Sequence, residues 1–510
     1  MISLPRFPNN PQLQRLIHDP FLHLWLILVA AIGILLNIPF HPDFAAGQTI
    51  AAKYLAGERP YLDIIENNPP MTFYLHVPSA LLEQWTGLRG EYWQDILAFV
   101  LCLFVIGVGE WLRTGHAVPQ DGASAKRVCI YVFTMLIMPM TSFGSRDQLT
   151  FVLMWPMLAL YAEDMVKPRT HPAWADAAIG LMAGLGCCIK FYFVLGPIFG
   201  CLFLCFVKRS FKPLFGLENI IAALFCLAYA GSIKLFHPAY FDLILPILPY
   251  TYFSGHPTLI YLLANGLLIL TTLYLLIALA KKDIRFHDPR TKLLLIAGFG
   301  FSVTYFAFAR NLPFRYLPPA SCLLMALPAA QNHAERPSLI KLYETTFLIL
   351  CAWFMLISNP YRAEATAFGK SLKLDRPNIL LLSGDLGEGH PLIRDLGGTL
   401  VNPGLHPWVT LGLMITMHDP TTSNQRAWFA QLIEWERDLT AKAAAKTPPD
   451  LILISNKSFM DFHIWARMNA SMDEMLRGYK EIGEKDNLSF LIRRTPEEMA
   501  KVPTRSELID

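Results

Sequence analysis

Long stretches without any charged side chain are the feature of this sequence that most restricts its fold. The run 21–40 contains no Asp, Glu, Lys or Arg, and 20 residues are enough to span the hydrocarbon core of a bilayer as one helix. Further uncharged runs follow at about 96–109, 128–145, 148–162, 177–189, 191–207, 219–233, 257–280, 293–309, 316–334 and 345–361. The pattern predicts a polytopic α-helical membrane protein with about 11 transmembrane helices.

The C-terminal part of the chain has a much higher charge density. Residues 362–510 hold 18 Lys or Arg and 20 Asp or Glu, whereas residues 1–361 hold 25 and 20. We therefore predict a transmembrane domain over 1–361 and a soluble domain over 362–510. In the soluble domain, three apolar segments predict buried strands and one segment with alternating charges predicts a surface helix. The strands are Ile379–Ser383, Leu451–Ser455 and Leu488–Ile492, and the helix is Gln425–Lys446. The prediction is a small α/β domain with a few parallel strands.

The overall composition argues against several classes of protein. Only 16% of the residues are charged, against about 25% in soluble proteins. The net charge of +3 is too small to indicate a nucleic-acid partner. All nine cysteines precede residue 362 and none shows zinc-site spacing, so neither a structural metal nor a disulfide framework is indicated.

The apolar segment Met71–Leu88 decides on which side of the membrane every later loop lies. If this segment does not cross, 17 of the Lys and Arg residues before 362 are cytoplasmic and 8 are not, and if it crosses the counts reverse. The excess of positive charge in cytoplasmic loops favours the first arrangement. The N-terminus is then cytoplasmic and the C-terminal domain extracytoplasmic. Residues 41–91 form one outer loop, in which 71–88 is an amphipathic helix on the membrane surface.

This first outer loop contains three carboxylates, Asp43, Asp63 and Glu66. An unpaired charge near a membrane surface is costly, so each carboxylate indicates either a function or an ion pair. The alternative to a function is that Asp63 and Glu66 are solvated residues paired with Lys53 or Arg59.

The order of residues in this loop resembles a known family. Asp43 follows the first predicted helix, and the motifs G-x-x-P-Y-x-D over 57–63 and E-x-x-P-P over 66–70 come next. This order resembles the first outer loop of the GT-C glycosyltransferases, among them bacterial relatives of protein mannosyltransferases and the aminoarabinose transferase that acts on lipid A. The segment 143–149 is similar to their second acidic loop, and Arg310 and Arg315 are similar to their late basic positions.

The resemblance implies an enzyme of the bacterial inner (plasma) membrane whose C-terminal domain lies in the periplasm. Such enzymes take a sugar from a polyprenyl-phosphate donor, whose lipid lies in the bilayer, and transfer it with inversion to an acceptor that the sequence does not identify. A carboxylate removes the proton from the acceptor hydroxyl, and cations stabilise the leaving phosphate. By position, Asp43 is the predicted general base, and Asp63 and Glu66 are the second candidates.

The resemblance also implies roles for other polar residues. Asp147 would bind the acceptor or a divalent metal, although the outer loops contain no D-x-D motif; the alternative is an ion pair with neighbouring Arg146. The donor phosphate would contact a set of basic residues, each of which could instead extend its charge to the membrane interface. The basic set is Lys190, Arg310 and Arg315, with Arg146 and His237 as further substrate-binding candidates.

Two other functions use similar substrates. A transporter or flippase of a lipid-linked sugar would show paired repeats and charges near the membrane midplane, whereas here the charges gather at one face. An O-antigen ligase or polymerase would carry its large functional loop late in the chain, whereas here the longest loop between spans is the first.

Overall fold

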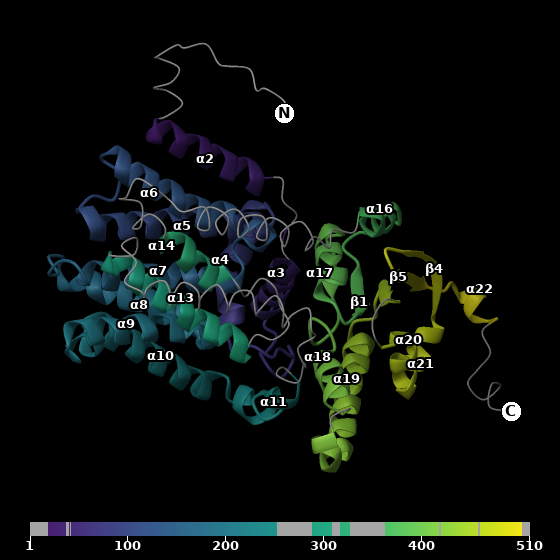
Figure 1. The fold of residues 1–510 in the computed structure, drawn as a ribbon. Helices are drawn as coiled ribbons and strands as arrows, with labels where there is room; N and C mark the ends of the chain where they lie inside the picture. Colours follow the sequence, from purple (N-terminus) through teal and green to yellow (C-terminus); the bar gives the residue numbers. More distant parts are fainter. Residues whose placement is uncertain are drawn as a thin grey trace, which may run out of the picture. The chain divides into compact units, whose positions relative to one another are not determined.

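The computed structural model describes residues 19–36, 40, 42–251, 288–308, 317–326, 363–417, 420–456 and 460–501 (Figure 1). The chain forms two compact units. The helical unit comprises Met1–Ile38, Asp95–Ala228 and Thr258–Ser358, and the α/β unit comprises Pro39–Gln94, Tyr229–Pro257 and Asn359–Asp510. The α/β unit therefore joins the predicted first outer loop to the C-terminal residues, because helices from these two distant segments pack against each other.

The helical unit is built from α-helices with short 3-10 or π-helical turns between some of them. Its described elements are α2 (Pro20–Leu35), most of α5 (Gly90–Thr114), α6 (Gly122–Val132), η1 (Phe133–Ile137), η2 (Met140–Ser142), α7 (Arg146–Asp164), α8 (Ala173–Ile189), η3 (Phe191–Val194), α9 (Leu195–Lys208), η4 (Lys212–Phe215), most of α10 (Leu217–Phe236), α13 (Pro289–Phe308) and α14 (Leu317–Ala326).

Helix α7 lies in the interior of the helical unit, since all of its residues except Arg146 are buried. Glycines on α8 allow the neighbouring backbones to approach closely. A Cβ atom at Gly180 would lie 2.4 Å from the Glu218 carbonyl oxygen of α10, and one at Gly186 would lie 3.0 Å from the Thr150 carbonyl oxygen of α7. Small residues at such contacts are typical of helix packing in membranes, where close van der Waals contact replaces the hydrophobic effect.

Three described helices are long and apolar enough to cross a membrane: Gly90–Thr114, Phe191–Lys208 and Leu217–Phe236. Shorter apolar helices cover Pro20–Leu35 and Ala173–Ile189. The predicted spans 257–280 and 345–361 lie outside the described residues, so the count of about 11 spans stays a prediction.

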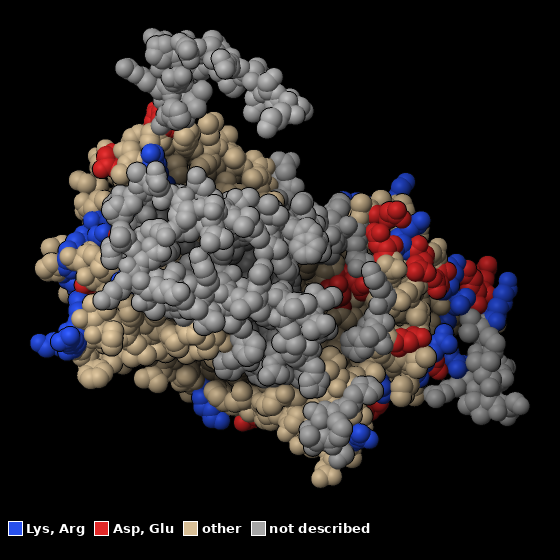
Figure 2. All heavy atoms as spheres, in the orientation of Figure 1, with Lys and Arg blue, Asp and Glu red and all other residues tan. Residues whose placement is uncertain are grey.

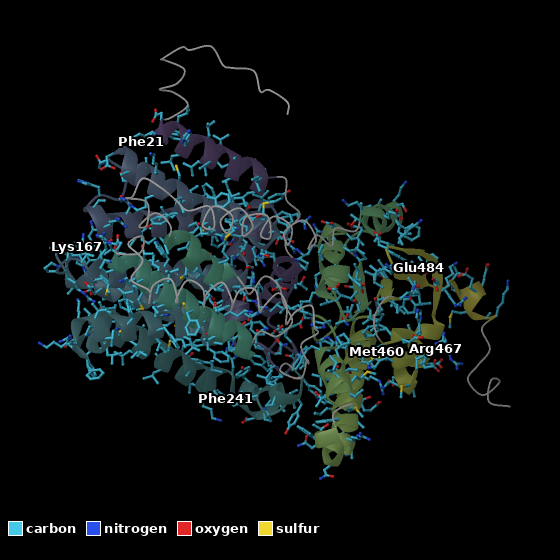
Figure 3. The ribbon with its side chains drawn as sticks, in the orientation of Figure 1. Phe21, Lys167, Phe241, Met460, Arg467 and Glu484 are labelled. Atoms are coloured by element: carbon cyan, nitrogen blue, oxygen red, sulfur yellow. The ribbon has the colours of Figure 1, made fainter. Side chains whose placement is uncertain are left out.

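Ion pairs connect the helix ends of the helical unit where the sequence predicts cytoplasmic loops. Arg169 contacts the carboxylates of both Asp164 and Glu218 at 2.7 Å. Lys167, labelled in Figure 3, donates to the carbonyl oxygens of Leu112 and Arg113 at 2.7 and 2.9 Å. These basic residues therefore connect neighbouring helices in addition to any role as topology signals.

The α/β unit contains five strands and twelve helical segments among its described residues, besides the ends of α5 and α10 that belong to it. The helices are α3 (Pro42–Leu55), α4 (Met71–Thr86), η5 (Tyr240–Ile244), α11 (Leu248–Thr251), α16 (Ala363–Ser371), α17 (Leu386–Asp395), α18 (Trp408–Thr416), η9 (Pro420–Gln425), α19 (Arg426–Lys446), α20 (Phe462–Arg467), α21 (Ala470–Arg477) and α22 (Pro496–Met499), η5 being a π-helical turn. The strands are β1 (Asn378–Leu382), β2 (Thr399–Leu400), β3 (Leu451–Ser455), β4 (Tyr479–Lys485) and β5 (Leu488–Arg493), in the order β2-β1-β3-β5-β4.

The three predicted strands are present as β1, β3 and β5, but the sheet is mixed rather than parallel. Strand β1 pairs in parallel with β2 and β3, whereas β5 is antiparallel to β3 and β4. A two-residue turn at Asp486 and Asn487, with φ of 51° and 62°, joins β4 to β5, and two such left-handed residues favour a tight hairpin. Strand β4 is rich in charge and lacks the apolar pattern by which the other strands are predicted.

The predicted surface helix is present as α19, but one of its carboxylates is buried. Glu436 is 4% exposed and accepts from the backbone N–H groups of Val409 and Thr410, at 3.2 and 2.7 Å. Burial outweighs these hydrogen bonds and raises the pKa of Glu436 to about 7. The carboxyl thus keeps its proton in the fold at pH values where an unfolded Glu is ionised.

We expect the α/β unit to lose stability as pH rises from the unfolded pKa of Glu436 towards its folded value. The loss is about 3 kcal/mol at neutral pH and above, because each pKa unit corresponds to about 1.4 kcal/mol. Glu436→Gln retains a hydrogen-bond acceptor but cannot ionise. When the thermal midpoint is measured at pH 5 and at pH 8, it should therefore fall less in this variant than in the parent protein. Glu474→Gln, at a side chain that is 71% exposed, is the control, and identical profiles for Glu436→Gln and the parent protein would contradict the prediction.

Surface charge differs between the two units. Figure 2 shows red and blue atoms crowded over the β4–β5 hairpin and α22, whereas tan atoms cover most of the visible surface of helices α9 and α10. This distribution agrees with helices that face lipid in the helical unit and with a solvated surface at the C-terminal residues.

The predicted orientation places the exposed residues Lys126 and Lys442 on opposite sides of the membrane. Single cysteines at these two positions, in a background without the native cysteines, should differ in their reaction with a membrane-impermeant maleimide added to intact cells. The cysteine at 442 should react before lysis and the one at 126 only after it. Equal labelling of both positions before lysis would contradict the orientation.

Candidate active site

The carboxylate of Asp43 lies in the first turn of α3, where the helix begins at Pro42. Proline is favourable at the first helical position because its missing N–H has no intrahelical partner there, and an acidic side chain in the first turn interacts favourably with the helix dipole. The side chain of Asp43 is half-buried. The local sequence therefore determines both the start of the helix and the depth of the carboxylate on it.

Two histidines from the C-terminal residues lie within electrostatic range of Asp43. His390 lies on α17, which packs against α3, and His406 precedes α18. Burial lowers the pKa of each imidazole to about 4, while the negative charge of Asp43 acts in the opposite direction on both. Both rings are therefore neutral at physiological pH.

The hydrogen bond of His390 determines its tautomer. Its Nε2 atom lies 2.7 Å from the carbonyl oxygen of Leu405. A carbonyl oxygen can only accept, so Nε2 carries the proton and Nδ1 carries the lone pair of the neutral ring. The His390 side chain is fully buried, and its Nδ1 atom has no hydrogen-bond partner among the described residues.

A third histidine, His76, lies on α4, which packs against α3, and is 2% exposed. Its ring occupies the space beside Gly47, where a Cβ atom would lie 2.3 Å from Nε2. Any larger residue at position 47 would displace the imidazole. The next residue, the buried Gln48, donates to the hydroxyl of Ser79 at 2.6 Å and so connects α3 to α4.

Ion pairs connect α17 to residues of the predicted first outer loop. Arg394 contacts Glu83 at 2.7 Å and Glu91 at 2.9 Å. Arg89 contacts Asp395 at 2.6 Å and Glu91 at 3.1 Å. Glu91 is fully buried, and a buried carboxylate shared by two guanidinium groups is a rigid connection. These contacts hold the helix that carries His390 against the segment that carries Asp43.

Lys53 also joins the two segments. Its ammonium group donates to the carbonyl oxygens of Asn402 and Leu400, at 3.0 and 3.4 Å, and contacts Glu58 at 3.1 Å. Lys53 therefore binds backbone oxygens next to β2 rather than the carboxylates Asp63 or Glu66.

The second-choice carboxylates have local partners. Asp63 is 39% exposed and forms an ion pair with Arg59 at 2.8 Å, which lowers its pKa to about 2. Glu66 is 5% exposed and accepts from the backbone N–H of Asn68 at 3.0 Å. The ion pair with Arg59, which is the alternative to a function for Asp63, is thus present. Glu66 stabilises the turn in which it lies.

His237, at the end of α10, contacts the hydroxyl of Tyr74 at 2.5 Å through Nε2. The Tyr61 ring, which is fully buried, lies edge-on to the same imidazole with the centroids 6.2 Å apart. His237 therefore belongs to an aromatic cluster with Tyr74 and with Tyr61 of the G-x-x-P-Y-x-D motif.

In the helical unit, the buried carboxylate of Asp147 pairs with Lys190 at 3.4 Å, with the two side chains 0% and 3% exposed. Lys190, rather than neighbouring Arg146, is its ion-pair partner. The Lys190 ammonium also lies 5.6 Å from the centroid of the Tyr192 ring. Two of the predicted substrate-binding residues are thus brought together.

No group of three or more His, Cys, Asp or Glu side chains is arranged to hold a metal ion in the part of the chain that the structure describes. Asp147 has an ammonium beside it and no second acidic or imidazole ligand in such a group. Metal binding by Asp147 therefore stays a prediction. Arg310 and Arg315, the other predicted phosphate ligands, lie outside the described residues.

His76, His390 and His406 are not among the residues that the sequence motifs predict as site residues. One signal was available, because both His390 and His406 directly precede a proline, as His237 does. His390 and its proline lie within α17, whereas His406 and its proline directly precede α18. Their nearness to Asp43 could not be read from that signal.

Neither the family models nor the curated proteins compared with this sequence give a match. Solved structures do align. ArnT from Cupriavidus metallidurans in the apo state is 12% identical, with a TM-score of 0.55, over 91% of this chain and 97% of its own. The same protein bound to undecaprenyl phosphate is 13% identical, with a TM-score of 0.50, over 92% and 98%. An oligosaccharyltransferase of Archaeoglobus fulgidus, tethered with an acceptor peptide, is 11% identical with a TM-score of 0.43, over 95% and 75%.

The alignment with ArnT, an aminoarabinose transferase, extends over nine-tenths of this chain and includes both its helical part and its C-terminal part. Identity of 12% is far too low to carry residue roles from one protein to the other, and it identifies the architecture alone. The chain has the fold of ArnT, which agrees with the fold that the motifs of the first outer loop predicted.

Proposed function

We propose that this protein is a membrane glycosyltransferase that moves a sugar from a polyprenyl-phosphate donor to an acceptor on the extracytoplasmic face. One observation carries the proposal: the fold of nearly the whole chain is that of ArnT, which has been solved with undecaprenyl phosphate bound. The half-buried carboxylate of Asp43, in the loop whose motifs resemble the family, supplies the chemistry that such a reaction needs.

In the proposed reaction Asp43 is the general base. The acceptor hydroxyl oxygen attacks the anomeric carbon of the donor sugar from the face opposite the phosphate, and the configuration inverts. The bond from the anomeric carbon to the phosphate oxygen breaks, and the hydroxyl proton passes to the Asp43 carboxylate. Polyprenyl phosphate leaves, and Asp43 then releases the proton to water. Base catalysis of this kind contributes about 10²- to 10⁴-fold.

The basic residues receive the leaving phosphate in this proposal. Lys190 is held by Asp147 in a buried pair, and a cation in a low-dielectric site stabilises a developing phosphate charge more than one in water. We assign Arg310 and Arg315 to the same phosphate from their predicted outer position. Arg146 and Asp147 would contact the acceptor or brace Lys190.

The three other candidates have supporting roles in the proposal. Asp63 and Glu66 shape the first outer loop through Arg59 and Asn68. His237 bonds to Tyr74 and would order the aromatic cluster beside the donor. The location is the bacterial inner (plasma) membrane with about 11 spans, a cytoplasmic N-terminus and a periplasmic domain over 362–510.

The test is a transfer assay with the purified full-length protein in lipid nanodiscs. Synthetic polyprenyl-phosphate sugars serve as donors and a mixture of envelope glycolipids and glycans as acceptors, and products are identified by mass. The expected result is an acceptor heavier by one sugar residue with stoichiometric release of polyprenyl phosphate. Movement of the intact donor across liposome membranes without any transfer would favour a flippase instead and would remove the enzyme proposal.

A further inference from the structure

The α9–α10 loop, residues 206–217 of the helical unit, lies between two apolar helical segments. Both Phe191–Lys208 and Leu217–Phe236 are long and apolar enough to cross a membrane. A short loop between two such segments has to lie at the bilayer surface, because neither segment leaves enough chain to reach further from it. The charge count places this surface on the cytoplasmic side.

Three phenylalanines of the α9–α10 loop are exposed. Phe206, Phe211 and Phe215 are 78%, 72% and 73% exposed. The backbone that carries them is held in place, since Asn219 of α10 donates to the carbonyl oxygen of Pro213 at 2.9 Å. Large apolar side chains that are exposed together indicate contact with a partner or with lipid. At the surface of a bilayer, the upper part of the acyl chains is the apolar material within their reach.

Basic side chains alternate with these phenylalanines. Lys208, Arg209 and Lys212 are all exposed, and residues 206–217 contain no Asp or Glu. Lys208 lies 4.0 Å from the carboxylate of Asp164. Arg209 and Lys212 form no ion pair with any residue that the structure describes.

The carboxylates next to the loop are already neutralised by another residue. Arg169 donates to both carboxylate oxygens of Glu218, at 2.7 and 2.8 Å, and contacts Asp164 at 2.7 Å. The protein therefore leaves the charges of Arg209 and Lys212 unbalanced. A guanidinium and an ammonium group bind phosphate oxygens through charge-assisted hydrogen bonds.

We propose that the α9–α10 loop is a binding surface for an acidic phospholipid of the bilayer. Arg209 and Lys212 contact the phosphate of the headgroup, and Phe211 and Phe215 contact its acyl chains. A zwitterionic lipid carries its own cation and gains less from the two basic residues. A soluble anion would satisfy the charges but not the exposed rings. This surface takes no part in the proposed sugar transfer.

Two double variants separate the contribution of charge from that of apolar contact. Arg209→Asn with Lys212→Gln removes both charges, and Asn tolerates the left-handed conformation that Arg209 adopts at φ of 48°. Phe211→Ser with Phe215→Ser retains the charges but removes the rings. All four side chains are exposed, so neither double variant should change the thermal midpoint.

The matched control is Lys234→Gln in the last turn of α10. Lys234 is also an exposed lysine beside a phenyl ring, since its ammonium group lies 5.5 Å from the centroid of Phe241. It differs in having a carboxylate partner, Asp242, at 3.8 Å. Its removal should therefore leave the preference for acidic lipid unchanged.

The experiment uses native mass spectrometry of the full-length protein, which is delipidated in detergent and titrated with dioleoylphosphatidylglycerol or dioleoylphosphatidylcholine. We expect the wild-type protein to bind the acidic lipid more tightly. Arg209→Asn with Lys212→Gln should bind it about 30-fold more weakly, which is the usual contribution of two basic residues near an anionic membrane surface. The phenylalanine variant should bind both lipids more weakly and keep the preference, and Lys234→Gln should match the wild type.

Three outcomes would overturn the binding surface. One is equal binding of the two lipids by the wild type, and another is unchanged binding of the acidic lipid by Arg209→Asn with Lys212→Gln. The third is displacement of the bound lipid by an equimolar amount of glycerol 3-phosphate, which carries the phosphate without acyl chains and would assign the loop to a soluble anion. If the charge variant alone has a lower thermal midpoint, the phenylalanine variant and the glycerol 3-phosphate competition still decide the matter.

Discussion

Replacing Asp43 by Asn is expected to reduce sugar transfer by about 10²- to 10⁴-fold, the usual contribution of general-base catalysis. The substitution keeps the size of the side chain and its position in the first turn of α3, but the amide cannot take a proton from the acceptor. Binding of undecaprenyl phosphate should be close to wild type, because the proposal assigns the phosphate to Lys and Arg residues. The measurements are the transfer rate and the donor affinity of the same nanodisc preparation.

Two comparisons make the Asp43 result specific. Asp375→Asn changes an exposed carboxylate in the same unit and should transfer at the wild-type rate. Asp63→Asn should cost less than Asp43→Asn, because Asp63 is engaged by Arg59. Near-normal transfer by Asp43→Asn together with an inactive Asp63→Asn or Asp147→Asn would assign the base to one of those residues instead.

Replacing Lys190 by Met is expected to destabilise the helical unit by about 3–5 kcal/mol, because it leaves a buried carboxylate without its counter-charge. Asp147 is fully buried and pairs with Lys190 at 3.4 Å. The double variant Asp147→Asn with Lys190→Met removes both charges and should regain most of that loss. Thermal unfolding of the protein in detergent, followed by the near-ultraviolet signal, measures both effects.

The double variant also separates a structural role of Lys190 from a role in donor binding. If Lys190 holds the donor phosphate, the double variant should be stable yet bind undecaprenyl phosphate weakly. If the pair is only structural, stability and donor binding should recover together, and the phosphate would then be left to Arg310 and Arg315. Lys208→Met, at a lysine that is 40% exposed and 4.0 Å from its carboxylate, is the control and should change neither quantity.

Several features follow from local sequence patterns and are present in the structure. The strands β1, β3 and β5 coincide with runs of apolar residues, and α4 begins at Met71, the first residue of the predicted amphipathic helix. Strand β4 escaped prediction because its charged sequence, YKEIGEK, carries no apolar run. Its pairing depends on the hairpin turn at Asp486 and Asn487 and on the neighbouring β5, which makes the sheet mixed.

The sequence by itself determined the broad class of this protein, because uncharged helical runs, charge density and loop motifs are properties of neighbouring residues. It also identified Asp43 as the first candidate. Only the tertiary structure decided which side chains surround that carboxylate. Lys53 and Asn402 are 349 positions apart and yet joined by a hydrogen bond, and the packing of α17 on α3 brings His390 towards Asp43. No periodic pattern in the sequence predicts such a contact, because it depends on how two helices that are distant in the sequence pack against each other.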